Sequence, residues 1–109
     1  MLKNIDFSKV VDLSQLVVYQ IGQIVSRTLV QNKSVGLTLF AFDKNEEISS
    51  HESTGDAIVL ILEGSAEITV GGEVFNPKKD EVVVMPAGVP HAVKSIDPFK
   101  MLLTVVFPQ

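Results

Sequence analysis

Residues 85–95 are Met85-Pro86-Ala87-Gly88-Val89-Pro90-His91-Ala92-Val93-Lys94-Ser95, and this stretch organises the predicted fold. The apolar residues 82–85 predict a strand that ends, or lies at a sheet edge, at Pro86, because proline has no backbone N–H to donate. Gly88 can adopt the positive φ that a tight turn needs. A second apolar segment begins at His91. The stretch therefore predicts a rigid corner between two strands, with one imidazole at its exit.

The imidazole of His91 has one counterpart, because His51 is the only other histidine of the chain. Histidine is the side chain that ordinarily changes protonation nearest to neutral pH, and its neutral ring is a common metal ligand. We expect the fold to bring these two side chains together.

The composition predicts one domain over residues 1–109, since a chain of this length cannot form two independent hydrophobic cores. Hydrophobic residues make up 46% and charged residues 20%, which is sufficient for a folded core. The net charge of −4 and the lack of a basic stripe argue against a nucleic-acid partner. There is no cysteine, which excludes disulfides, a thiolate nucleophile and a zinc–thiolate site.

The N-terminal stretch does not resemble a signal peptide, and no run approaches the ~20 apolar residues of a membrane-spanning helix. We therefore expect a cytoplasmic protein without a membrane partner. Residues 1–6 are expected to form a mobile or edge segment.

Seven or eight short strands are expected, with no amphipathic helix beyond one turn that Asp12 or Ser14 would cap. Gly22 is a candidate β-bulge, and Gly71-Gly72 predicts a two-residue hairpin turn. The expected strands lie at residues 20–30, 35–42, 56–62, 66–70, 73–75, 81–85 and 101–107, and the short segments 48–53 and 92–93 are the candidates for a further strand. Strands at this spacing indicate an all-β fold, a small antiparallel β-barrel or sandwich.

Three of the expected strands are apolar on both faces, at residues 58–62, 82–85 and 101–103. A monomeric antiparallel barrel would show one of those faces to water, so the outer face needs a second cover. A partner subunit would provide that cover, and we therefore expect a homodimer. The alternative is that terminal segments of the same chain fold over the outer face.

Two stretches together resemble the paired motifs of the cupin superfamily. The second cupin motif is usually written G-x5-P-x-G-x2-H-x3-N. Pro86, Gly88 and His91 match it in register, while Asp80 stands at the first glycine and Ser95 at the asparagine. The resemblance implies a cupin fold, which is a small jelly-roll-like barrel.

The first cupin motif, usually G-x5-H-x-H-x3-4-E-x6-G, places its closing glycine at Gly64. In that register His51 matches the first histidine, Ser53 stands at the second and Ala57 at the glutamate. Typical metal-binding cupins supply three histidines and one glutamate, so the resemblance implies that His51 and His91 are the remaining metal ligands. Alanine cannot ligate and a serine hydroxyl is a poor ligand, so any divalent metal (zinc, nickel, iron, manganese or copper) would be weakly held.

The candidate ligand-binding site is one cavity lined by His51, Ser53, Ala57 and His91, since residues two and six positions after His51 lie on its face of a regular strand. Phe42 is a further candidate at the mouth of this cavity, although packing the barrel is its more ordinary role. The alternative for both histidines is that they are hydrogen-bonded core residues with no ligand.

Two carboxylates lie near the first motif. Period-two alternation places Glu52 and Asp56 on the opposite face, unless a bulge at residues 54–55 turns one of them inward. Arg27 is the only arginine and would pair with a carboxylate ligand if it faced inward, but a surface position is equally expected.

Three functions are compatible with these residues. The first, which we favour, is a small-molecule-binding protein with an organic ligand or a weakly held metal at His51 and His91. The second is an enzyme of oxygenase, isomerase or epimerase type, either metal-dependent or with a histidine as general base. The third is a non-catalytic dimeric scaffold or sensor. The fold alone does not choose between them, because unrelated activities share it.

Overall fold

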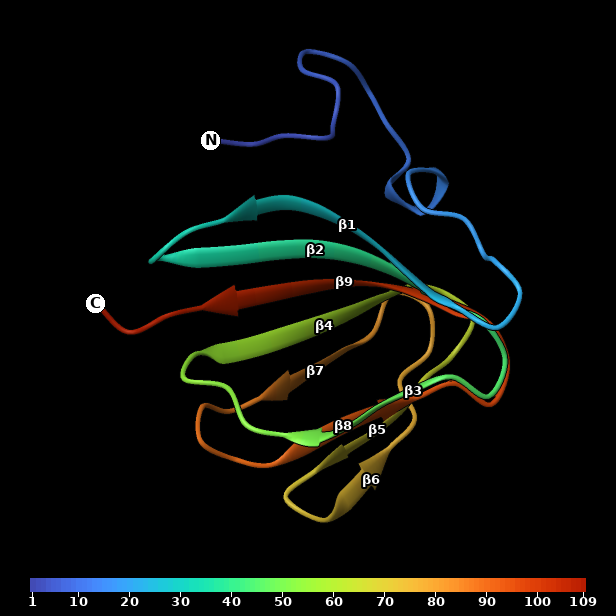
Figure 1. Ribbon diagram of the computed structural model, residues 1–109, viewed down its shortest axis with the longest axis vertical. Coiled ribbons are helices and arrows are strands. Elements are labelled where there is room, and N and C mark those ends of the chain that lie inside the picture. The colour runs from blue at the N-terminus through green and yellow to red at the C-terminus, as the bar shows by residue number, and fades with distance from the viewer.

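The computed structural model describes residues 1–109 and consists of nine β-strands and one short 3₁₀ helix (Figure 1). The all-β prediction is confirmed. The 3₁₀ helix η1 spans Leu13–Gln15, and the strands are β1 (Ile24–Gln31), β2 (Val35–Phe42), β3 (Glu47–His51), β4 (Asp56–Glu63), β5 (Glu67–Val70), β6 (Glu73–Phe75), β7 (Val82–Met85), β8 (His91–Lys94) and β9 (Phe99–Val106).

The strands form two antiparallel sheets that face one another (Figure 1). The larger sheet has five strands in the order β1-β2-β9-β4-β7, and the smaller has four in the order β3-β8-β5-β6. Strands distant in sequence are neighbours in both sheets, as expected for the jelly-roll-like fold. The chain alternates between the sheets, so β3 and β4 are consecutive in sequence but lie in different sheets.

The main hydrophobic core lies between the sheets. Alternate residues of β2 face different sides: Phe42 belongs to this core, while Leu39 and Ala41 face outward, as period-two alternation predicts. The rings of Phe42 and Phe99 stack with centroids 4.6 Å apart, and both side chains are fully buried. The pair fills one end of the space between the sheets.

The N-terminal segment covers part of the outer face of the five-stranded sheet. Val17 packs there in a second buried cluster with Leu29, Leu39 and Ala41. Figure 1 shows this segment, in blue, beyond β1 and away from the smaller sheet. Over this part of the face, the segment of the same chain provides the cover that the apolar strands need.

Lys100 connects the N-terminal segment to the five-stranded sheet. This side chain is only 6% exposed, its Nζ donates to the carbonyl oxygen of Ser14 at 2.7 Å, and it lies 3.9 Å from the carboxylate of Glu63. The Tyr19 hydroxyl donates to the same Glu63 carboxylate at 2.5 Å. Burial, and secondarily this hydrogen bond, raises the pKa of the Tyr19 phenol above its ordinary value.

The rest of the outer face stays open in the single chain. Ile58, Val82, Val84 and Val106 are exposed there, along β4, β7 and the end of β9. The homodimer stays a prediction, and this open part of the face is where it applies.

The first strand differs from the prediction. It begins at Ile24, because Gly22, with φ of +70°, lies in a turn before it and donates its N–H to the Asp43 carboxylate at 2.7 Å. Gly22 is therefore not a bulge. The register shift of β1 against β2 falls between Thr28 and Val30 instead.

Two other local predictions, the helix cap at Asp12 and the hairpin turn at Gly71-Gly72, agree with the structure. Asp12 caps η1 by accepting the backbone N–H of Ser14 at 3.0 Å. Residues 1–6 include an edge contact, since Lys3 donates its N–H to Leu29 of β1. Gly71-Gly72 forms the hairpin turn between β5 and β6. The last strand begins two residues earlier than predicted, at Phe99.

The corner between β7 and β8 has the predicted form. Gly88 adopts φ of +74°, and the Val89 N–H donates to the Pro86 carbonyl oxygen across the turn. A Cβ at Gly88 would meet no atom within 4 Å, so the backbone conformation, and not lack of space, is what favours glycine there. No helix of the structure is both long enough and apolar enough to cross a membrane.

Candidate ligand-binding site

The two histidines lie opposite one another in the smaller sheet. His51 is the last residue of β3 and His91 is the first residue of β8, and the two are paired in the antiparallel register. Their ring centroids are 4.4 Å apart, with the ring planes at 66°. The structure therefore brings together the two imidazoles that the sequence singles out.

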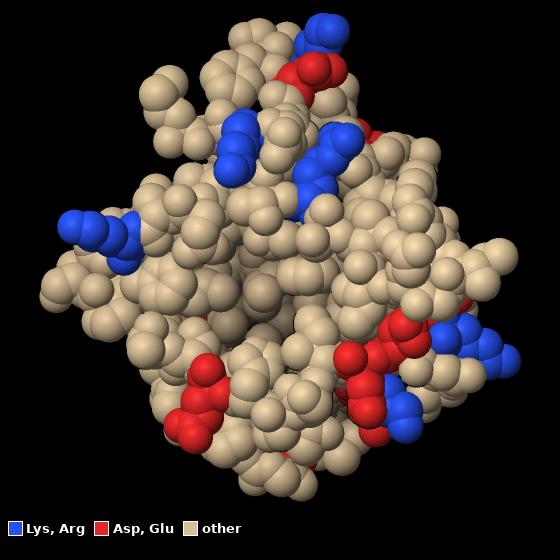
Figure 2. Space-filling view, viewed as in Figure 1, with Lys and Arg blue, Asp and Glu red and all other residues tan.

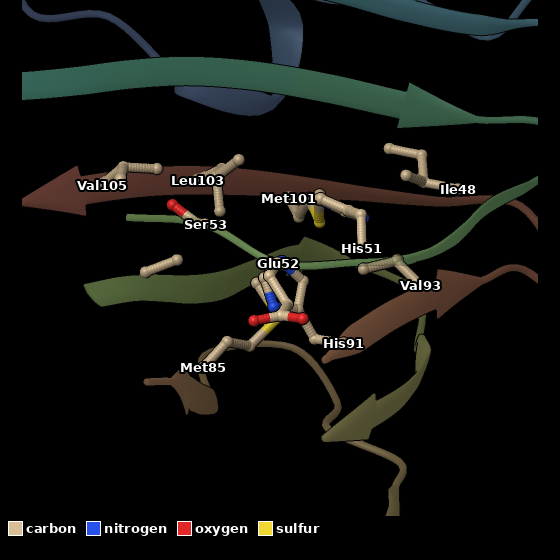
Figure 3. Close-up of a pocket in the computed structure, with 11 residues that line it drawn as sticks. Ile48, His51, Glu52, Ser53, Met85, His91, Val93, Met101, Leu103 and Val105 are labelled. Atoms are coloured by element: carbon tan, nitrogen blue, oxygen red, sulfur yellow. The ribbon is translucent and has the colours of Figure 1, made fainter. Parts of the chain in front are cut away.

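Both rings border a cavity of about 240 Å³ between the sheets (Figure 3). His51 and Glu52 are exposed and lie at its mouth, whereas His91 is 3% exposed and lies deeper. The lining also includes Ser53 and Ala57, as predicted, together with the apolar side chains Ile48, Met85, Val93, Met101, Leu103 and Val105.

The hydrogen bonds of the two rings determine which nitrogen carries the proton. Nδ1 of His51 lies 2.9 Å from the Ser49 carbonyl oxygen, and Nδ1 of His91 lies 3.1 Å from the Val89 carbonyl oxygen. A carbonyl oxygen only accepts, so each Nδ1 carries the proton and donates it. In the neutral rings, both Nε2 atoms are left as acceptors.

The Nε2 atom of His91, a residue of the cavity lining, is not fully buried. This atom has no hydrogen-bond partner in the protein. Every fully buried side-chain nitrogen or oxygen of the chain does have a partner, so Nε2 of His91 is not one of them. This nitrogen is therefore accessible, and the adjoining cavity is the space from which a ligand would reach it.

Small side chains leave room for the cavity. Ala57 of β4 is paired with Met85 of β7 on one side and Val105 of β9 on the other. Its methyl group reaches less far between the sheets than the larger side chains farther along β4. Ser53 accepts the Gly55 N–H at its hydroxyl at 3.2 Å, and that hydroxyl keeps its own hydrogen for a ligand.

Period-two alternation predicts the wrong side of the strand for the Glu52 side chain. Glu52 lines the cavity, although a regular strand would turn it away from the side of His51 and Ser53. The register of β3 against β8 shifts between Ile48 and His51, and β3 ends at His51, so period two does not hold here.

The sequence contains one indication of this irregular segment, which is Gly55. A Cβ there would lie 2.6 Å from the Val106 carbonyl oxygen, so the chain passes close to β9 as it crosses to the larger sheet. The bulge considered at residues 54–55 is not the observed one, and Asp56 does not line the cavity. Its carboxylate accepts the Ala87 N–H at 2.9 Å.

Phe42 lies outside the cavity. The register of β2 against β9 places it opposite Phe99, where it is fully buried, so it packs the core and does not reach the mouth. Arg27 is exposed on β1 and donates to the Asn4 carbonyl oxygen at 3.2 Å. Neither side chain is part of the cavity lining.

The corner between β7 and β8 is bonded to the segment that carries the first motif. Gly88 donates its N–H to the Ser53 carbonyl oxygen at 2.9 Å, and Ala87 donates to Asp56 as described above. The His91 end of β8 is therefore held in place relative to Ser53 by backbone contacts.

The donor set of the cavity does not fit a tightly held catalytic metal. No three His, Asp or Glu side chains of the chain are grouped so that they could hold one ion. The two Nε2 atoms fall short of the three protein ligands that a catalytic zinc site ordinarily has.

No cationic side chain lines the cavity. Figure 2 shows the face of the molecule that is seen in Figure 1, with a hollow near its centre and with both basic and acidic side chains farther out. The polar atoms of the lining come from the two imidazoles, Glu52 and Ser53, apart from backbone groups.

Comparison with known proteins gives matches over most of the chain. A family model described as Cupin domain matches residues 38–107. The structure of a conserved protein of unknown function from Streptococcus pyogenes is 47% identical, with a TM-score of 0.96, and the match covers 99% of this chain and 95% of that one. A cupin superfamily protein from Desulfitobacterium hafniense DCB-2 is 31% identical, with a TM-score of 0.94 and 99% of both chains covered.

One relative is named as an enzyme. A 5-nitrosalicylic acid 1,2-dioxygenase from Bradyrhizobium sp is 30% identical over 84 residues. The match covers 72% of this chain and 41% of the dioxygenase, so this chain spans well under half of that protein's length.

Proposed function

The chain belongs to the cupin family, and from this premise we propose that it binds a small organic molecule in the cavity between its two sheets. The observation that carries the proposal is the pair of imidazoles, His51 and His91, which border one cavity with their rings 4.4 Å apart. A concave apolar pocket with a few convergent polar groups is the usual form of a small-ligand site.

The size of the cavity supports a small ligand. Its volume of about 240 Å³ lies below the ~300–1,000 Å³ of pockets that take drug-sized molecules. The floor is formed by buried side chains, including Met85, Val93 and Met101, which would contact the apolar part of a ligand. His51 and Glu52 at the mouth, together with the deeper His91, would orient its polar part.

A divalent transition metal is a secondary ligand in this proposal. Zinc, nickel, iron, manganese or copper would be held by His51 and His91 through Nε2, and such an ion would act as a Lewis acid. With two protein donors the ion exchanges readily, so we assign no catalytic step to it.

The second candidate is an enzyme. The likeness to the dioxygenase favours it, but that relative is more than twice as long as the matched region, and its activity does not carry over from a partial match. A histidine acting as general base needs no metal, and Nε2 of His51 or His91 would be the atom that takes the proton. A dimeric scaffold with no ligand is the third candidate.

The proposal is tested by filling the cavity, first with a ligand and then with a larger side chain. Titration of tag-free protein with cyclohexanol, followed by ¹H–¹⁵N NMR, should shift the backbone signals of cavity residues such as Val93 and Met101. The Ala57→Leu variant, which places a larger side chain in the cavity, should abolish these shifts. Ile58→Leu, one residue along on the outer face of β4, is the matched control and should leave them unchanged.

Two further measurements decide the outcome. If Ala57→Leu does not fold by circular dichroism, Ala57→Val gives the same test with a smaller side chain. If none of cyclohexanol, cyclohexylammonium and cyclohexanecarboxylate shifts the cavity signals of the parent, the binding proposal is wrong. A stoichiometric metal that resists dialysis in tag-free protein would instead favour the enzyme.

A further inference from the structure

The polar groups of the cavity share one chemical property, which is that they accept hydrogen bonds. Nε2 of His51 and Nε2 of His91 are acceptors in the neutral rings, because each Nδ1 donates to a backbone carbonyl oxygen. The Glu52 carboxylate has no hydrogen to donate and accepts only. The Ser53 hydroxyl is the one side-chain group of the lining that keeps a donor hydrogen for a ligand, because each Nδ1 hydrogen is already bonded to a backbone carbonyl oxygen.

From this one-sided set we propose that the cavity selects a small cationic ligand, an ammonium group on an apolar body, over a carboxylate of the same shape. The inference rests on the proposed function and adds the class of ligand to it. An ammonium group has up to three N–H donors and one positive charge, and so it matches two Nε2 acceptors and one carboxylate.

A carboxylate ligand would find no cationic partner in this cavity. Arg27 is exposed on β1, outside the lining. Lys100 lies on β9 but faces the opposite side of the sheet, where its Nζ is bound to the Ser14 carbonyl oxygen at 2.7 Å. The anion would also lie near the negative charge of Glu52, and like charges at short range are unfavourable.

The rest of the lining determines the other end of the ligand. Seven of the eleven lining residues are hydrophobic, and the deeper ones, such as Val93 and Met101, are buried. Glu52 is exposed at the mouth, so the ammonium group is expected there and the hydrocarbon part below it. A compact cycloalkyl group suits a cavity of about 240 Å³.

The inferred preference differs from what the name of the dioxygenase relative indicates, since that protein is named for an aromatic acid. The two proteins are 30% identical over the matched residues. A ligand preference does not carry over to a cavity that lacks the charged side chain needed to pair with that ligand. The cavity of this chain is therefore expected to have the opposite charge preference.

The experiment compares three probes of one shape: cyclohexylammonium, cyclohexanol and cyclohexanecarboxylate. Dissociation constants are measured by NMR titration of the full chain at about pH 8, where a model-peptide imidazole is neutral and an alkylamine is protonated. EDTA is present so that a bound metal does not mediate the contact. We expect cyclohexylammonium to bind about tenfold more tightly than cyclohexanol, in keeping with one charged hydrogen bond at an exposed site, and the carboxylate to bind most weakly.

Two variants separate a local contact from net charge. Glu52→Gln should remove most of the advantage of cyclohexylammonium over cyclohexanol. Glu47→Gln, an exposed position at the start of strand β3 and outside the lining, removes the same charge and should leave the advantage intact.

The outcomes distinguish this inference from the proposed function. If cyclohexanol or cyclohexanecarboxylate binds as tightly as cyclohexylammonium, or if Glu47→Gln acts like Glu52→Gln, the cationic preference is wrong while the binding function stands. If no probe shifts the cavity signals, the binding function itself is wrong.

Discussion

The two ends of the space between the sheets are built from the same strands, yet one is packed and the other is hollow. We call the region of Phe42, Phe99 and Ile61 the packed end, and the region of Ala57 and His91 the hollow end. Those three residues of the packed end are fully buried and do not line the cavity. The hollow end contains this cavity of about 240 Å³.

The difference comes from a gradient in side-chain size along antiparallel neighbours. The inward positions of β4 grow from Ala57 to Ile61, and those of β9 shrink from Phe99 to Val105. Because the strands are antiparallel, the small inward residues of β4 lie opposite the small inward residues of β9. Ala57 is paired with Val105, and the larger Ile61 is paired with the larger Met101. Side-chain volume at alternate positions, and not topology, therefore decides whether this space is core or site.

The largest effect is expected at the packed end. Phe99→Ala should lower the free energy of unfolding by about 3–5 kcal/mol, because it removes a stacked ring from a region that cannot collapse. Val105→Ala at the hollow end should cost about 1 kcal/mol or less, since its side chain already borders space. Urea denaturation measures both, and equal costs would contradict the distinction between the ends.

The second effect would convert the hollow end into a metal site. Introducing Ser53→His together with Ala57→Glu should raise nickel or zinc affinity roughly a hundredfold, because two protein ligands would join His51 and His91. Isothermal titration calorimetry against the parent measures the gain, with Ile58→Glu on the outer face as control. A folded double variant that binds no better than the parent would show that the register of the first motif is wrong, and the metal interpretation with it.

A third, smaller loss of stability is expected at Ser95, beside the packed end. Ser95 is fully buried; its hydroxyl donates to the Asp43 carbonyl oxygen and accepts the Glu46 N–H at 3.3 Å. Ser95→Ala should cost about 1 kcal/mol, because the Asp43 carbonyl oxygen and the Glu46 N–H lose their bonds to the hydroxyl and keep only the 3.4 Å hydrogen bond to one another. Ser49→Ala, an exposed position of β3, should be nearly neutral in the same thermal or urea unfolding measurement.

The smallest effect is a dependence on pH at the loop that follows Phe42. The Gly22 N–H, and then the backbone of Lys44, donate to the Asp43 carboxylate and hold its pKa below the ordinary 3.8. A lowered folded-state pKa stabilises the protein above the unfolded pKa, and this contribution disappears as the pH falls through the folded pKa.

Unfolding measured from neutral pH down to acid should therefore show the parent losing slightly more stability below about pH 3.8 than Asp43→Asn does. Glu47→Gln serves as the control for a carboxylate on an exposed strand position. A difference between Asp43→Asn and the parent that stays constant over the whole pH range would argue against this contribution.

Much of the site was predictable because it depends on local geometry. The corner at Gly88, the pairing of His51 with His91 and the inward side chains Ser53 and Ala57 all follow from motif spacing and strand alternation. Glu52 was not predictable in this way, since its position depends on a register shift against β8 and on the close passage of Gly55 by β9. Phe42 is only a secondary candidate for the mouth of the cavity in the sequence analysis, and its position at the end of β2, opposite Phe99, places it at the packed end.

The sequence by itself determined the all-β fold, the strand faces and the two histidines of the site, because period-two alternation and turn chemistry are properties of a few neighbouring residues. Only the tertiary structure decided that the N-terminal segment covers part of the outer face of the five-stranded sheet, held by Lys100 and Glu63, and that the carboxylate of Glu52 lies at the mouth of the cavity. These features join residues far apart in the chain, so their positions depend on how the sheets pack and on which charged groups find partners, which no local pattern records.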